Sequence, residues 1–262
     1  MLKVKVKNNH EINWKLAELC AEMVEEAYND IDTMEVYLIK HKIKYSKIKF
    51  FSNGSAQAYG IKMHDYTVIA FRGTEPTQFG DILADVKAWP AHAETVGHVH
   101  GGFKTELDKL WPAMTKWLGK SIATRKFVIC GHSLGAAMAT ICATRIHLVN
   151  KDRSLYTYGC PRVGTKEWGE QFNDIANFRF VNNNDIVPHV PPFGYYEHIG
   201  ELYYISYTDH IQSHTTWLHR LRDKLAGRCK AWSKFQFFDN FYDHLSANYL
   251  NNTLSYFINS KF

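Results

Sequence analysis

Hydrophobic and polar residues follow two spacings along this chain, one typical of strands and one typical of helices. Short apolar runs predict strands at residues 58–62, 66–71, 126–130, 155–158, 177–181 and 202–206, the last being the final strand. Apolar residues at helical spacing predict helices at 16–28, 79–89, 104–118, 134–149 and 217–232. Pro112 is a candidate break in the third of these helices. Because strands and helices alternate, we expect an α/β fold with a mostly parallel central sheet flanked by helices.

The sequence Gly131-His-Ser-Leu-Gly135 separates the strand predicted at 126–130 from the helix predicted at 134–149. A tight strand-to-helix turn of this form holds a serine in a strained backbone conformation above the sheet edge, over the start of a helix. Glycines on both sides let the two elements approach without Cβ clashes. The pattern therefore predicts that Ser133 is a catalytic nucleophile. The alternative is a turn in which the Ser133 side chain only caps the helix.

A nucleophilic serine needs a base within hydrogen-bond reach, and that base needs an orienting acid. In α/β-hydrolases the chain order is serine, then acid, then histidine. Asp185 comes shortly after the strand predicted at 177–181, so we expect it to be the acid. The alternative is an Asx turn before Pro188. The other acids considered are Asp152, Asp174 and Asp209.

The base should lie later still, in a loop near the end of the chain. The histidines that follow Asp185 are His189, His198, His210, His214, His219 and His244. His189 is too close to Asp185 in sequence to turn back over the serine. His219 lies on the helix predicted at 217–232, which is rich in basic residues and is called the basic helix below. His244 starts a helical stretch after a loop at 237–243, so we expect it to be the base.

An apolar stripe between Pro76 and Pro90 suggests a movable segment. Its members are Phe79, Ile82, Leu83, Val86 and Trp89, which fall on one face of a helix. We expect a lid at about 75–90 that exposes these side chains to lipid when it opens. The alternative is a surface helix packed permanently on the sheet. The basic helix could likewise contact an anionic lipid surface or be simply solvated.

Length and composition narrow the classes of protein that remain. The 262 residues fit one domain, 1–262, and the net charge of +5 comes with no nucleic-acid-binding motif. The five cysteines are scattered without metal-ligand spacing, so we expect no disulfide, no metal and no cofactor. The alternating charges at the start do not form a signal peptide, and no apolar run reaches the roughly 18 residues of a transmembrane helix. We expect a cytoplasmic protein, or one exported by another route.

Eight short motifs occur in an order that resembles the class 3 lipases, the group that includes the filamentous-fungal triacylglycerol lipases. They are Phe71-Arg-Gly-Thr74, Asp81-Ile-Leu-Ala-Asp85, Val99-His-Gly-Gly-Phe103, the serine motif, Thr157-Tyr-Gly-Cys-Pro-Arg-Val-Gly164, Arg179-Phe-Val-Asn-Asn-Asn-Asp-Ile-Val-Pro188, Tyr196-Glu-His-Ile-Gly200, and Asp243-His244 followed by Tyr249. The resemblance implies an α/β-hydrolase fold and the triad Ser133, Asp185 and His244.

The resemblance also implies several finer features. The oxyanion hole would combine the N–H of Leu134 with the N–H and hydroxyl of Thr74. The lid would span about 75–90, and a basic helical insert about 211–234 would be similar to that of bacterial members. His100 would be a structural hydrogen-bonding residue rather than a catalytic one.

The function implied is hydrolysis of lipid carboxylic esters, most naturally as a triacylglycerol lipase with a lipid ester as its partner. Because one fold hosts several activities, phospholipase A1 and carboxyl or feruloyl esterase stay open as alternatives. A non-catalytic binding protein with the hydrolase fold is a more distant alternative.

Overall fold

The computed structural model describes residues 11–73, 89–208, 210–213, 215–216, 220–224, 248–251 and 253. Its centre is an eight-stranded sheet with the order β1-β2-β3-β6-β7-β8-β9-β10. The strands are β1 (Tyr45–Asn53), β2 (Ala56–Met63), β3 (Tyr66–Phe71), β6 (Lys126–His132), β7 (Arg153–Tyr158), β8 (Ala176–Asn182), β9 (Glu201–Ile205) and β10 (Ile211–Ser213). The strands from β3 to β9 are parallel, whereas β1, β2 and β10 pair antiparallel at the two edges.

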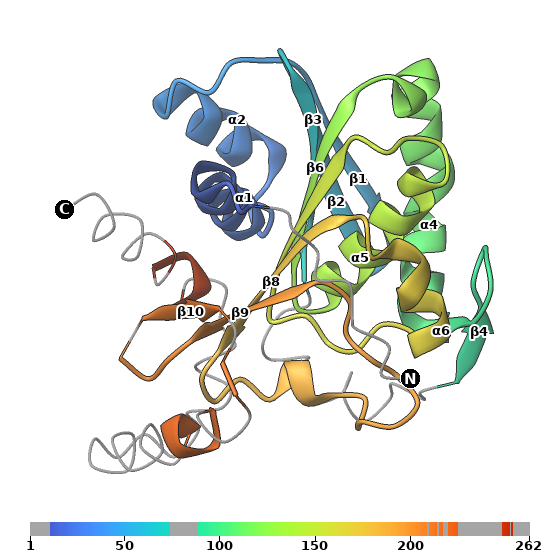
Figure 1. Ribbon diagram of the computed structural model, residues 1–262. Helices are drawn as coiled ribbons and strands as arrows, with labels where there is room; N and C mark the ends of the chain where they lie inside the picture. The colour runs from blue at the N-terminus through green and yellow to red at the C-terminus, as the bar shows by residue number, and fades with distance from the viewer. Residues whose placement is uncertain are drawn as a thin grey trace.

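Helices cover both faces of this sheet, as Figure 1 shows. One face is covered by α1 (Trp14–Glu26) and α2 (Ile31–Lys40), and the other by α4 (Gly101–Leu118), α5 (Leu134–His147) and the short α6 (Lys166–Gly169). A small hairpin of β4 (Pro90–His92) and β5 (His98–His100) precedes α4. Short 3₁₀ turns are η2 (Gly119–Ala123), η3 (Glu170–Phe172) and η4 (Val187–His189).

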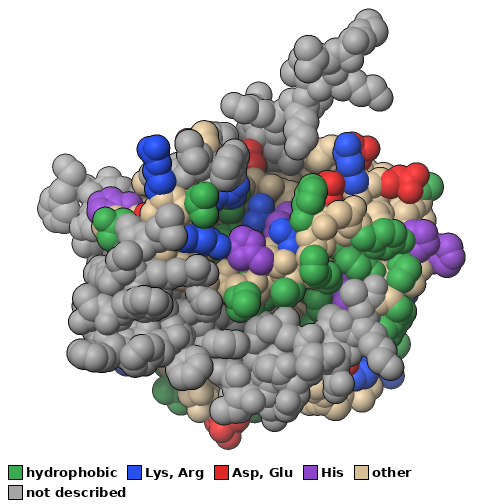
Figure 2. Space-filling model, turned by 90° about the horizontal axis from the view of Figure 1, so that it is seen from below, with side chains coloured by type: hydrophobic (Ala, Val, Ile, Leu, Met, Phe, Trp, Pro, Cys, Tyr) green, Lys and Arg blue, Asp and Glu red, His purple; other side chains and the backbone are tan. Residues whose placement is uncertain are grey.

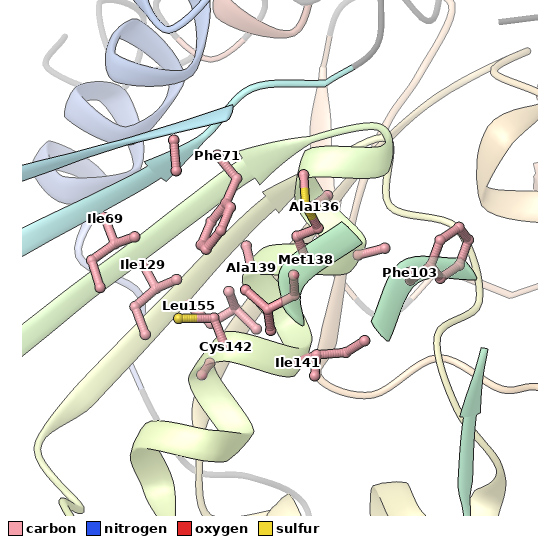
Figure 3. Close-up of a cluster of buried hydrophobic side chains, with 14 of the residues drawn as sticks. Ile69, Phe71, Phe103, Ile129, Ala136, Met138, Ala139, Ile141, Cys142 and Leu155 are labelled. Carbon is pink, nitrogen blue, oxygen red and sulfur yellow. The ribbon is translucent and has the colours of Figure 1, made fainter. Parts of the chain in front are cut away.

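The core divides into two layers because successive side chains of a strand point to opposite faces of a sheet. In β3 and β6, Ile69 and Ile129 face α4 and α5, whereas Val68 and Val128 face α1. Figure 3 shows Ile69, Ile129 and Leu155 lying against α5. Both layers are apolar, so these central strands are nearly continuous hydrophobic runs, as is typical of parallel sheets.

Helix α5 lies at the centre of the molecule, and all fourteen of its residues are buried. It packs on β3, β6 and β7 on one side and on α4 on the other. A helix covered all round needs no polar face, which explains why its sequence is rich in alanine and other apolar residues. This burial fixes the position of its N-terminus, which is the part that matters for the site.

Most predicted elements are confirmed within one to three residues of their ends, and three predictions are wrong. The strand at 202–206 is not the last, because β10 follows it. For the same reason the basic insert begins as a strand at Ile211–Ser213, not as a helix. Pro112 does not break α4, which continues through it to Leu118. None of the helices in the described part of the chain is long and apolar enough to cross a bilayer.

Candidate active site

Ser133 occupies the tight turn between β6 and α5. Its backbone has φ 57° and ψ −127°, and only one other non-glycine residue in the described part of the chain has a positive φ. Such a conformation costs on the order of 1–3 kcal/mol and persists only where the surroundings hold it. Here the N–H of Ser133 donates to the carbonyl of Tyr158 on β7, at 3.0 Å. The neighbouring strand thus holds the strained residue in place.

The two glycines of the serine motif are required by backbone contacts. A Cβ on Gly131 would lie 2.3 Å from the carbonyl oxygen of Gly135. A Cβ on Gly135 would lie 2.5 Å from the carbonyl oxygen of Phe71, at the end of β3. Both distances are shorter than real contacts, so α5 can start this close to β3 and β6 only with glycine at both positions.

The Ser133 hydroxyl is buried, and among the described residues its Oγ has no hydrogen-bond partner. It makes no capping bond to α5, so the interpretation of Ser133 as a helix cap is wrong. Leu134 is the first residue of α5, and its N–H is one of those that have no acceptor within the helix. The Ser133 hydroxyl, unpaired among the described residues, therefore lies at a helix N-terminus, beside an N–H that has no acceptor within the helix, where negative charge is favoured.

The chain leaving β3 passes directly against the serine. A Cβ on Gly73 would lie 3.2 Å from the Cβ of Ser133 and 2.7 Å from the carbonyl oxygen of His132. The next residue, Thr74, lies outside the described residues, so its predicted place in the oxyanion hole stays a prediction.

Asp185 follows β8 and is completely buried. Its Oδ1 accepts the N–H of Val187 at 2.8 Å, which is an Asx turn, so the structural alternative raised from the sequence does occur. Its Oδ2 accepts the hydroxyl proton of Tyr249 at 2.5 Å. The same tyrosine oxygen accepts the N–H of Asn182 at 2.9 Å. The carboxylate is thus fixed on both oxygens at the sheet edge that also bears Ser133.

Two tyrosines that the sequence does not predict as site residues support this region. The ring centre of Tyr249 lies 5.8 Å from that of His132. In the sequence, Tyr249 is notable only as part of a motif. Tyr28, which follows α1, forms a hydrogen bond of 2.9 Å with Nδ1 of His132. The guanidinium of Arg72 lies over the Tyr28 ring, 5.3 Å from its centre. These contacts hold the residue that precedes the serine.

The other acids considered lie at the opposite ends of the strands from Ser133. Asp152 precedes β7 and Asp174 precedes β8, so both lie at the amino ends of the strands, opposite Ser133. Asp174 is mostly exposed and contacts His147 at 3.3 Å. Asp209 lies outside the described residues.

Of the histidines considered as the base, His214, His219 and His244 lie outside the described residues. The others bond to groups other than the serine. His198 Nε2 contacts the carbonyl of Pro188 at 2.8 Å, and His210 Nδ1 contacts that of Thr208 at 2.8 Å. The Lys224 ammonium donates to His189 Nε2 at 2.5 Å. The assignment of His244 as the base stays a prediction.

His100 does not form the structural hydrogen bonds expected of it. The side chain is buried, and neither ring nitrogen has a partner among the described residues. It stacks on Phe103 with ring centres 4.1 Å apart. Burial lowers the pKa of His100 from 6.5 to about 4, so the ring is neutral near pH 7. His100 therefore acts as a packing residue at the start of α4.

Of the apolar stripe proposed for the lid, only Trp89 is described, and its side chain is half exposed. Its carbonyl accepts the N–H of Gly101 at 2.9 Å, which fixes the end of the stripe against α4. Phe79, Ile82, Leu83 and Val86 lie outside the described residues, and the lid stays a prediction.

The architecture, with a nucleophile turn between a parallel strand and a buried helix, is that of an α/β-hydrolase. Residues 68–195 match the family described as Lipase (class 3). The chain is 34% identical to a lipase of Rhizomucor miehei over an alignment of 155 positions that covers 53% of this chain and 41% of that protein. It is 40% identical over 118 residues to Toxin TseL of Vibrio cholerae, covering 42% of this chain and 18% of the toxin.

Solved structures agree with these sequence matches. The triacylglyceride lipase of Rhizomucor miehei superposes with a TM-score of 0.57 at 25% identity, over 72% of this chain and 77% of that one. A mutant form of MDLA from Penicillium cyclopium superposes with a TM-score of 0.68 at 20% identity, over 89% and 96%. Over residues 68–195, just under half of its length, the chain is thus similar to the class 3 lipases. It spans less than half the length of the two curated relatives named above.

Proposed function

We propose that the protein hydrolyses carboxylic esters of lipids, as a triacylglycerol lipase, through an acyl-enzyme on Ser133. The observation that supports this most directly is the strained, buried Ser133 hydroxyl at the N-terminus of α5. Asp185 also supports the proposal, because hydrogen bonds hold its carboxylate at the same end of the strands as Ser133. The similarity of residues 68–195 to the class 3 lipases supports the choice of lipid esters as the substrate class.

In the proposed mechanism the Ser133 Oγ attacks the ester carbonyl while His244 takes the hydroxyl proton. Asp185 orients the imidazole and stabilises its protonated form. The N–H of Leu134 and the N–H and hydroxyl of Thr74 stabilise the oxyanion of the tetrahedral intermediate. His244 then returns the proton to the leaving alcohol, which departs and leaves the acyl group on Ser133. A water molecule then attacks the acyl group on Ser133 with His244 again as the base, and the fatty acid is released. None of these steps calls on a metal or cofactor.

The proposal is tested by Ser133→Ala. Its kcat on emulsified tributyrin and on p-nitrophenyl butyrate should fall by roughly 10⁶, the order of loss on removing a triad serine. Circular dichroism should be unchanged, because the hydroxyl has no partner among the described residues. Ser154→Ala removes another buried serine hydroxyl, at the opposite end of the sheet, and should keep full activity. Turnover that survives Ser133→Ala would exclude the mechanism.

The identity with Toxin TseL favours a second, biological proposal, in which the lipid hydrolysis harms a cell. Expression of the wild type and of Ser133→Ala in a bacterial host, directed to the cytoplasm or to the periplasm, tests it. Arrested growth with the wild type alone would support a toxic hydrolase. Equal growth of both strains in both compartments would reject it.

A further inference from the structure

The β4–β5 hairpin carries two histidines directly opposite each other. In the register of the hairpin, His92 on β4 lies across from His98 on β5. Hydrogen-bonded and non-hydrogen-bonded pairs alternate along an antiparallel ladder. The next pair towards the turn is hydrogen-bonded, because the N–H of Ala93 donates to the carbonyl of Gly97 at 3.2 Å. His92 and His98 are therefore a non-hydrogen-bonded pair, the kind whose side chains lie closest together.

The two imidazole rings have the spacing that one shared metal ion requires. Their centres lie 4.7 Å apart, and their planes are inclined by 38°. A zinc ion binds an imidazole nitrogen at about 2.0–2.1 Å, so the ring centre lies about 3.2 Å from the ion. Two rings on one ion then have centres about 4.5 Å apart at a right angle and about 5.2 Å apart at the tetrahedral angle. The spacing of the His92 and His98 rings falls between these two values.

The backbone that carries His98 is fixed by the chain that follows β7. The N–H of His98 donates to Oγ1 of Thr165 at 3.1 Å, and its carbonyl accepts the N–H of Thr165 at 2.8 Å. The N–H of His100, on the same strand, donates to the carbonyl of Val163 at 2.8 Å. On one side of the His98 ring, the ring of Tyr195 lies 6.5 Å away. Ligands on a backbone fixed in this way lose little conformational freedom when they bind an ion.

Both rings are open to an ion from solvent. His92 is exposed and His98 is partly exposed. Among the described residues, neither ring forms a hydrogen bond or an ion pair. Figure 2 shows histidine side chains at the surface on the right, the side on which Figure 1 places β4. An ion can therefore reach this pair without displacing another partner of either imidazole.

The ligand chemistry of the pair selects the class of ion. Imidazole nitrogens bind Zn²⁺, Cu²⁺ and Ni²⁺ well, whereas Mg²⁺ and Ca²⁺ prefer oxygen ligands. No group of three histidines, cysteines or carboxylates in the described part of the chain could hold a metal ion. Glu94, the nearest carboxylate along the hairpin, accepts a hydrogen bond from Arg145 at 2.9 Å. The pair therefore suits an ion that keeps water in its remaining positions.

We propose that His92 and His98 together chelate one divalent transition-metal ion, represented by Zn²⁺, through one imidazole nitrogen each. The bound ion joins β4 directly to β5, in the hairpin that follows the predicted lid. Chelation strengthens binding, because the second imidazole is already held close once the first has bound. The cysteine spacing that led us to expect no metal does not bear on this pair. The proposal is also independent of hydrolysis at Ser133.

The first test is calorimetric titration of Zn²⁺ into metal-free wild type, His92→Gln, His98→Gln and His64→Gln, with circular dichroism to check the fold. The Kd of one bound zinc should rise at least about tenfold in each variant of the pair, because each leaves a single imidazole. His64→Gln is the control, since it removes an exposed imidazole that contacts Asp65 at 2.6 Å, and its Kd should not change. No zinc binding by the wild type, an unchanged Kd in either variant of the pair, or equally tight binding of Mg²⁺ would overturn the proposal.

The second test locates the ion in the wild type, so that the folding of a variant does not affect the result. Diethyl pyrocarbonate modifies unprotected imidazole nitrogens, and mass spectrometry measures the modification of each histidine. Zn²⁺ should slow the modification of both His92 and His98 several-fold and leave that of His64 unchanged. Equal slowing at all three positions would show non-specific binding and reject the site. Protection of only one member of the pair, or of neither, would contradict chelation.

Discussion

At the scale of single residues, the side chains that hold the site are aromatic hydroxyls bonded to polar groups far away in sequence. The Tyr249 hydroxyl joins the Asp185 carboxylate, 64 residues earlier, to the backbone of Asn182. The Tyr28 hydroxyl reaches His132, 104 residues later. Pattern and spacing along the sequence select Ser133 and Asp185, because each follows a strand. They cannot select Tyr249 or Tyr28 on chemical grounds, because only the folded sheet brings these partners together.

Tyr249→Phe should leave one oxygen of a buried carboxylate without its donor. We expect the free energy of unfolding to fall by about 2 kcal/mol, since hydrogen bonds to charged groups contribute on the order of 1.5–3 kcal/mol. We also expect kcat to fall, because Asp185 is less firmly oriented. Urea unfolding and p-nitrophenyl butyrate hydrolysis measure the two effects. Tyr156→Phe is the control, because that hydroxyl makes only a 3.4 Å contact with the Asn13 carbonyl. Equal losses in the two variants would contradict the role given to Tyr249.

At the scale of elements, the approach of α5 to β3 sets the position of the nucleophile. Gly135→Ala places a Cβ 2.5 Å from the Phe71 carbonyl oxygen, so the helix must move or the protein must unfold more easily. We expect a loss of about 3 kcal/mol or more, at the upper end of what overpacking costs. Urea unfolding should show this loss of stability, and kinetic assays should show a lower kcat because the nucleophile is displaced.

Gly119→Ala is the control that distinguishes the steric overlap at Gly135 from the cost of a strained backbone alone. Gly119 has φ 53°, but a Cβ there would meet nothing within 4 Å. Its substitution should cost about 1–2 kcal/mol and leave activity unchanged. If Gly135→Ala is no more harmful than Gly119→Ala, the close approach of the two elements is not what the motif requires.

The β4–β5 hairpin is joined to α4 and α5 by one buried arginine. Arg145 pairs with Glu94 and with Asp108, each at 2.5 Å, while its side chain is 6% exposed. Burial raises the pKa of Glu94, but the charge and hydrogen bonds of Arg145, aided by Lys104, outweigh burial and hold that pKa below its ordinary value of 4.5. A lowered carboxyl pKa contributes stability above the unfolded value, and this stability is lost as the pH falls through the folded value.

Arg145→Met should therefore reduce stability near pH 7 by about 2 kcal/mol, less than for a fully buried pair because both carboxylates are partly exposed. The stability of the wild type should fall below about pH 4.5, and this fall should be smaller in the variant. Urea unfolding at a series of pH values measures both. Lys104→Met removes a cation that lies 3.3 Å from the same Glu94 but at a more exposed position, and should change stability little. An unaltered acid profile in Arg145→Met would reject the linkage.

At the scale of the whole molecule, the order and type of the central elements follow from the sequence, whereas the edges do not. The strands β3, β6, β7 and β8 are apolar runs between turn signals, and the structure confirms them. The three residues of β10 are too short to show a pattern, and β1 alternates lysine with apolar residues at the margin of the sheet. An edge strand is half solvated, so its sequence is under a weaker hydrophobic constraint.

The loop that holds Phe193 and Tyr195 also offers large apolar side chains to solvent on the proposed active-site face. They are 78% and 50% exposed, and the Tyr195 ring lies 6.5 Å from that of His98 on β5. Phe193→Ser should lower adsorption to a triacylglycerol emulsion, and the rate on emulsion should fall several-fold relative to that on a soluble ester. Val149→Ser, which changes a 57% exposed residue after α5 at the opposite edge of the sheet, is the control. Equal adsorption of both variants would show that this loop does not meet the lipid.

In the described part of the chain, the nine-residue strand β1 has a neighbour on one side only. An open margin of this length offers its backbone to any extended peptide, including another copy of the same protein. Lys47 and Lys49 are exposed on this strand, and a second copy added there would bring like charges together. Lys47 and Lys49, which make β1 hard to predict from the sequence, should thus prevent the protein from associating into fibrils in concentrated solution.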